Sequence, residues 1–168
     1  MSLGALPLLL SEFDREMGAT RRVLARVPER HLDWRPHERS MTLGRLTTHV
    51  ASLPGWLATM VRENAFDLAD VALEPLADPS PAVAIARFDA AAADARRALV
   101  ETTDARLLEI WTLRKEGHDL VSAPRIVALR TEGLYHLVHH RGQLTVYLRL
   151  LNVPLPPIYG PTADEGRL

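Results

Sequence analysis

The chain has 168 residues, of which 47% are hydrophobic and 24% are charged, and its formal net charge is -1. These values are typical of a soluble globular chain, so we expect one domain over residues 1–168 and find no electrostatic basis for nucleic-acid binding. The absence of cysteine excludes disulfides, thiolate metal ligands, iron–sulfur clusters and a cysteine nucleophile. Any bound metal must therefore have nitrogen or oxygen ligands.

The apolar run near the start, at residues 3–10, is too short to span a membrane and lacks the basic flank and cleavage site of a signal peptide. It leads directly into the amphipathic pattern of Phe13, Met17 and Val23, so it belongs to the fold. We therefore expect no association with a membrane and a cytoplasmic location.

Apolar residues at helical spacing predict the first two helices. The first is expected at about residues 6–27, and it ends before Pro28. The second begins after Thr42, which is expected to be its N-cap, and continues through an apolar stripe to Met60. Pro54 lies inside this stripe, removes one backbone hydrogen bond and is expected to kink the helix.

Two further helices are predicted in the second half of the chain. Ser80 and Pro81 form an N-cap followed by a first-turn proline, and an alanine-rich helix is expected to run to about residue 100. The last helix is expected at residues 125–151, with Ser122 and Pro124 as its N-terminal cap.

The segments between these helices are expected to be irregular, apart from a short extended piece at residues 110–113. Trp34 is expected to anchor the turn-rich connection at residues 28–39, and the proline-rich tail is expected to lie extended over the surface. About 15 residues separate the second and third helices at residues 64–79, too many for a tight hairpin. The fold class is therefore expected to be all-α, a four-helix bundle with long crossover connections.

The last helix carries the residues that organise the candidate site. His136 and His140 are four residues apart, so both imidazoles point from one face of the helix, at the spacing that can share one metal ion. The alternative is structural: the chain has seven histidines, and a buried histidine is more often hydrogen-bonded than metal-bound. A pair also supplies only two of the three or four ligands that a metal usually takes.

His49 offers a third ligand, because it belongs to the apolar stripe of the second helix and should point inward. A three-histidine set of His49, His136 and His140 is uncharged, so a divalent ion would keep its charge and at least one open coordination position. Glu132 is either a hydrogen-bond partner of a ligand imidazole or a solvated charge. Gln143 is either a water-positioning amide or, preferably, one side of an interhelical hydrogen bond.

The remaining histidines are not expected to be ligands, since His139 points away from the pair and His31, His37 and His118 are placed in solvated loops. Gly142 lowers helix stability by about 1 kcal/mol relative to alanine. We expect it to allow the close approach of another helix or of the tail.

Several segments together resemble the DinB/YfiT-like metalloproteins, in particular the DinB-like branch. The resemblance covers nearly the whole chain in order, and its matching pieces are Trp34-Arg35-Pro36, the run from Ser40 to Ala51, His136 to Leu144, and Tyr159-Gly160-Pro161. It implies a four-helix bundle, often dimeric, with a divalent metal held by His49, His136 and His140. The alanine-rich helix faces also suit a symmetric homodimer.

The resemblance leaves the activity open. Some relatives resemble transferases that use a low-molecular-weight thiol, which favours a metal-dependent transferase acting on a small-molecule substrate. The alternatives are a metal-dependent hydrolase and a non-catalytic metal-binding stress-response protein. Zinc or nickel is the expected metal, and iron, cobalt and manganese are also compatible with histidine ligands.

Overall fold

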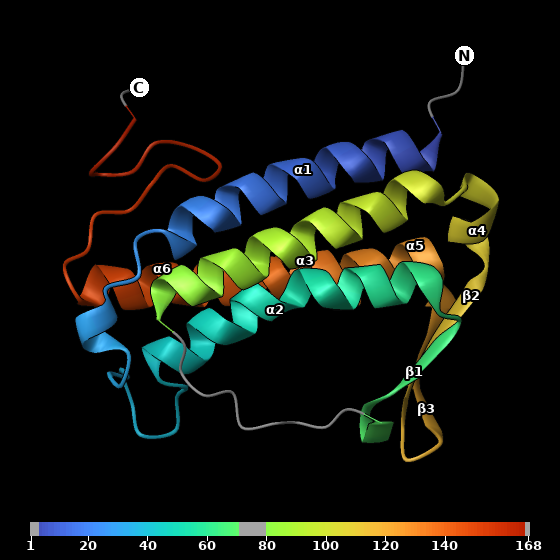
Figure 1. Ribbon diagram of the computed structural model, residues 1–168, viewed down its shortest axis with the longest axis horizontal. Helices are drawn as coiled ribbons and strands as arrows, with labels where there is room; N and C mark the ends of the chain where they lie inside the picture. The colour runs from blue at the N-terminus through green and yellow to red at the C-terminus, as the bar shows by residue number, and fades with distance from the viewer. Residues whose placement is uncertain (1–3, 71–79, 167–168) are drawn as a thin grey trace.

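The computed structural model describes residues 4–70 and 80–166, and most of them are helical. Four long helical stretches lie side by side, and a small sheet lies at one end of them (Figure 1). The fourth stretch is continuous but changes type along its length, since α5 passes through the π-helical segment η3 into α6. The elements in chain order are α1 (Ala5–Leu24), η1 (Glu29–His31), α2 (Leu43–Arg62), β1 (Ala65–Asp67), η2 (Leu68–Asp70), α3 (Pro81–Glu101), α4 (Asp104–Leu108), β2 (Ile110–Lys115), β3 (His118–Pro124), α5 (Arg125–Ala128), η3 (Leu129–Tyr135) and α6 (His136–Leu150).

Local capping chemistry determines where two of the long helices begin, as predicted. The Thr42 side chain accepts a hydrogen bond from the Arg45 amide at the start of α2. The Ser80 side chain accepts one from the Val83 amide at the start of α3, where Pro81 is the first helical residue. Both caps satisfy backbone donors that the helix itself leaves without partners.

The long helices run in two opposite directions. α2 and α3 run the same way and pack extensively against each other, so the end of α2 and the start of α3 lie at opposite ends of the molecule (Figure 1). α1 and the α5–η3–α6 stretch run the opposite way; α1 packs against α3, the last stretch packs against α2, and α1 and α6 also contact each other. No helix in the described part of the chain is long and apolar enough to cross a membrane.

The sheet is the part of the fold that the all-α prediction missed. The predicted extended piece at residues 110–113 lies within β2, which pairs with β1 in parallel and with β3 in antiparallel orientation. The β2–β3 turn consists of Glu116 and Gly117, both with positive φ, as two-residue hairpins require. The Asp67 carboxylate accepts hydrogen bonds from both of their amides and so fixes this turn to β1.

The last helical stretch begins at Arg125 with Pro124 as its N-cap residue, as predicted, but Ser122 does not cap it. Ser122 and Pro124 lie in β3, where they pair with β2 and make no capping hydrogen bond. Arg125, the first residue of α5, instead lies fully buried and donates hydrogen bonds to the carbonyls of Met60 and Glu63. These carbonyls terminate α2, so a buried arginine satisfies acceptors that the helix end leaves free.

A buried ion pair ties the tail to the helices. Arg141 of α6 lies 2.7 Å from the Glu16 carboxylate of α1, and both side chains are almost fully buried. The hydroxyl of Tyr159 donates to the same carboxylate at 2.8 Å and accepts from Arg141 at 2.6 Å. The hydroxyl of Thr20 accepts a further hydrogen bond from Arg141, so the buried charges have several partners.

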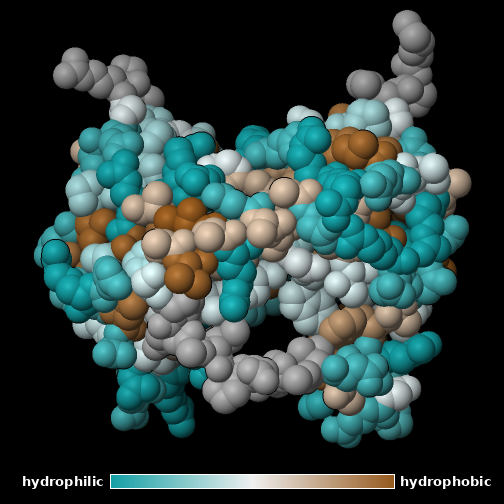
Figure 2. All heavy atoms as spheres, viewed as in Figure 1, coloured by the Kyte–Doolittle hydropathy of each residue, from teal (hydrophilic) through white to brown (hydrophobic). Residues whose placement is uncertain are grey.

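The hydrophobic core lies between the long helices and includes buried residues from each of them. From the side shown in Figure 2, the surface is mostly hydrophilic, with hydrophobic side chains in separate patches. Burial of the apolar helix faces is the main source of stability in a domain of this kind.

Candidate metal centre

His49 lies at the edge of the buried face of α2. Its helical neighbours Leu46, Val50 and Leu53 are buried in the core, whereas His49 itself is only half-buried. The side chain therefore points along the contact between α2 and α6 rather than into the centre of the core.

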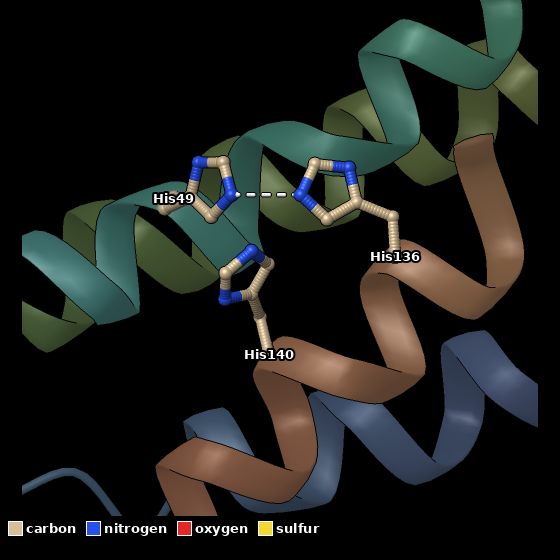
Figure 3. A group of neighbouring side chains, drawn as sticks. All are labelled: His49, His136 and His140. Carbon is tan, nitrogen blue, oxygen red and sulfur yellow. Dashed lines mark hydrogen bonds between the residues drawn. The ribbon is translucent and has the colours of Figure 1, made fainter.

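His136 and His140 come from the first two turns of α6 and face His49 (Figure 3). The Nε2 atoms of His49 and His136 lie 3.3 Å apart. The His140 ring centroid lies 4.4 Å from that of His49 and 4.7 Å from that of His136. The structure thus brings together all three histidines that the sequence predicted, with one nitrogen from each within 4.8 Å of the others.

The nitrogen that His140 presents is determined by a hydrogen bond on the other side of its ring. His140 Nδ1 lies 2.8 Å from Oε1 of Gln143. Because an amide oxygen accepts a proton from Nδ1, Nε2 of His140 keeps its lone pair for the cluster.

This contact corrects the preferred expectation for Gln143. Gln143 makes its hydrogen bond within its own helix, not between helices, and it acts directly on a candidate ligand. The three-residue spacing of His140 and Gln143 contained the signal for this contact, since residues three apart are neighbours on a helix.

Burial keeps the three imidazoles neutral. Burial, with smaller contributions from the nearby His140, His136 and Arg45, lowers the pKa of His49 to about 4. Burial also lowers the pKa of His136 and of His140, against the opposing effects of Glu132 on His136 and of Gln143 on His140. At neutral pH all three rings can therefore donate a lone pair without first losing a proton.

The glycine that lets the two helices approach is Gly133, not Gly142 as predicted. A Cβ at Gly133 would lie 2.3 Å from Cδ2 of Leu57 on α2, whereas a Cβ at Gly142 would meet no atom within 4 Å. Gly133 lies one turn before His136, within η3. The close approach that brings His49 to the α6 histidines therefore depends on a residue without a side chain.

The other histidines lie outside the cluster. His139 is exposed, and its ring stacks edge-on against that of His140 without facing His49 or His136. His31 and His37 lie in the connection between α1 and α2, and His118 is an exposed residue at the start of β3 rather than in a loop. The prediction that these four are not ligands agrees with their positions.

The chain is therefore a mostly helical protein in which two neighbouring helices bring together three histidines that could hold a metal ion. Comparison with known sequences gives the family. The sequence model of the DinB family matches residues 1–167, and the chain belongs to this family.

Individual relatives agree with this assignment. The protein YrdA of Bacillus subtilis (strain 168) is 25% identical over 162 residues, which cover 93% of this chain and 89% of that protein. A DinB-like protein of Bacillus subtilis, YjoA, has a similar structure with a TM-score of 0.69 at 19% identity, covering 90% of this chain and 97% of that one. A DinB-like protein of Bacillus cereus has a TM-score of 0.69 at 23% identity, with 89% and 95% covered. At these identities the two structures establish the fold.

Proposed function

We propose that the protein binds one divalent metal ion through His49, His136 and His140 and uses it as an enzyme, transferring a group to or from a small thiol. The observation that supports this most directly is the convergence of three ring nitrogens within 4.8 Å from two helices. Membership of the DinB family supports the same ligand set.

The chemistry follows from the kind of ligand. Three neutral imidazoles do not offset the charge of the ion, and among the described residues no carboxylate joins them to complete a fourth ligand. A divalent ion in such a site lowers the pKa of a coordinated thiol or water and so supplies a nucleophile at neutral pH. Gln143 orients the His140 ring, so that this ligand is positioned before any metal arrives.

The proposal extends to metal and assembly. Zinc or nickel is the preferred metal, because imidazole suits both, and supply in the cell decides between them and iron, cobalt or manganese. We also propose a four-helix bundle of the DinB type with long crossover connections, a homodimer, and action in the cytoplasm on a small-molecule substrate. The parallel direction of α2 and α3 supports the crossover.

Metal content of the untagged protein tests the ligand set. We expect about one divalent ion per chain, and His49→Ala and His140→Ala should lose it to a similar extent. His139→Ala is the matched control, since His139 neighbours His140 in the sequence but is exposed and outside the cluster. A His49→Ala protein that binds metal like the parent would refute the third ligand.

A thiol titration tests the enzymatic part. The protein is loaded with cobalt(II), and 2-mercaptoethanol is added while the visible and near-ultraviolet spectrum is followed. A saturable sulfur-to-cobalt charge-transfer band supports an exchangeable position, and turnover of thiol-dependent model substrates should follow it. A spectrum that responds to neither thiol nor small anions would favour the non-catalytic alternative, and hydrolysis without thiol would favour the hydrolase.

A further inference from the structure

A small pocket lies on α2 beyond the candidate metal centre. It has a volume of about 210 Å³ and is lined by Ser52, Gly55, Trp56 and Thr59 of α2 and by Phe66 of β1. The rings of Trp56 and Phe66 form its aromatic wall, with their centroids 4.4 Å apart. None of these residues takes part in the metal centre described above.

Helix geometry places this pocket next to the metal centre. Trp56 is seven residues after His49, which corresponds to about two turns, so the two side chains leave α2 in nearly the same direction about 10 Å apart. Ser52 and Thr59 lie further round the helix, on the side of His49 away from the buried leucines. The pocket therefore lies along α2 from His49, on the side of this histidine that faces away from the buried core.

The face of α2 that carries His49 is charged on one side of this histidine and apolar on the other. Arg45, one turn before His49 on the same side, is exposed and charged. Trp56, two turns after it, stacks against Phe66 beside a glycine that leaves space. Along α2, an elongated ligand that binds a metal at His49 would therefore meet a charged side chain toward Arg45 and an apolar surface toward Trp56.

We infer that the Trp56–Phe66 pocket is a substrate subsite that binds an aromatic or other compact apolar group of the molecule held at the three histidines. This inference rests on the proposed metal centre and adds the chemical class of the substrate: a polar metal-binding group joined by a short flexible linker to an apolar end. The volume suits one ring, since a cavity of about 150 Å³ holds benzene.

Gly55 allows the pocket to be filled without touching the histidines. A Cβ at this position would meet no atom within 4 Å, and Gly55 lies inside α2, so Gly55→Leu should occupy the pocket and preserve the helix. Thr59→Leu fills the same pocket from its far side. Gly18→Leu is the matched control, because Gly18 is an exposed helical glycine of α1 with space for a side chain.

The experiment compares two hydroxamates on the cobalt(II)-loaded full-length protein. Acetohydroxamate carries only the metal-binding group, whereas 5-phenylpentanohydroxamate carries the same group with a ring on a four-carbon linker. Titrations followed by the cobalt spectrum should show the phenyl compound binding at least about tenfold more tightly. Gly55→Leu and Thr59→Leu should reduce this ratio to near one by weakening the phenyl compound alone, and Gly18→Leu should leave it unchanged.

The possible failures are distinguishable. Equal binding of the two hydroxamates to the parent, or a ratio that survives both pocket-filling variants, would refute the subsite and leave the metal proposal standing. Absence of any response to acetohydroxamate would refute the exchangeable metal position, and the subsite with it.

Discussion

The contact between Gly133 and Leu57 offers a direct test of how the two histidine-bearing helices are held together. In Gly133→Ala the new methyl group would lie 2.3 Å from Cδ2 and 3.1 Å from Cγ of Leu57. Leu57 is only 2% exposed, so it cannot turn away into solvent. Overpacking of this kind costs about 1–3 kcal/mol, and alanine regains about 1 kcal/mol over glycine in a helix. We expect a net loss of about 0–2 kcal/mol in the free energy of unfolding.

Gly142→Ala is the matched control in the same helical stretch. Its Cβ meets no atom within 4 Å, so only the helix preference remains and the variant should gain up to about 1 kcal/mol. The two variants should therefore differ by about 1–3 kcal/mol, or roughly 2–12 °C in Tm for a domain of this size. Urea denaturation of the metal-free proteins, with Tm by circular dichroism, measures the difference.

The same substitution should affect the metal centre. Because Gly133 lies one turn before His136, separating η3 from α2 also moves His136 and His140 away from His49. Zinc affinity by competition with a chromophoric chelator should fall for Gly133→Ala and not for Gly142→Ala. Equal stability and equal zinc affinity of the two variants would contradict the role given to Gly133.

Two other predictions concern polar contacts. Gln143→Leu removes the acceptor that orients the His140 ring, so zinc affinity should fall by about 10–100-fold while Gln143→Glu retains it, as measured by the same competition. Tyr159→Phe removes a hydrogen bond to the Glu16 carboxylate and should lower the free energy of unfolding by about 1–2 kcal/mol at neutral pH. Burial raises the pKa of Glu16, but the bonds from Tyr159 and Arg141 lower it on balance below 4.5. Ionised Glu16 therefore stabilises the fold above pH 4.5, and this contribution is lost as the pH falls through the lowered pKa, so the Tyr159→Phe deficit in urea denaturation should shrink in acid. A deficit that is constant with pH would contradict this assignment.

The helix starts were predictable because their causes are local. A side-chain oxygen followed by free backbone amides is enough to begin α2 at Thr42 and α3 at Ser80. The sheet was not predictable, because β1 and β2 pair across more than 40 residues and β1 has only three residues. Ser122 carries the sequence signal of a helix cap but is used as a strand residue, because it pairs with Thr112.

The candidate site was largely predictable for a different reason. His136 and His140 share a helix face by spacing alone, and His49 follows from the apolar stripe in which it lies. The two glycines of the last helical stretch could not be told apart, since only the packing of Leu57 distinguishes Gly133 from Gly142. A tertiary contact is not encoded in the residues next to a glycine.

Several contacts that do not involve the candidate metal ligands hold α6 against its neighbours. Arg141 binds Glu16 of α1, and Tyr147 packs edge-on against Trp34 and donates to the carbonyl of Met41. At the other end of the stretch, Arg125 binds the terminal carbonyls of α2. These contacts join the helix to its neighbours without involving the histidines.

These contacts determine how much the proposed metal ion would need to contribute to the stability of the fold. In a zinc finger the ion organises the fold, and its binding energy is largely folding energy. Here the imidazoles already converge, and the His140 ring is oriented by Gln143, so little of the binding energy of the proposed ion would be needed for reorganisation. Under our proposal, the ion would keep an exchangeable position open without loss of the fold, which is the condition that a catalytic site must meet and a structural one need not.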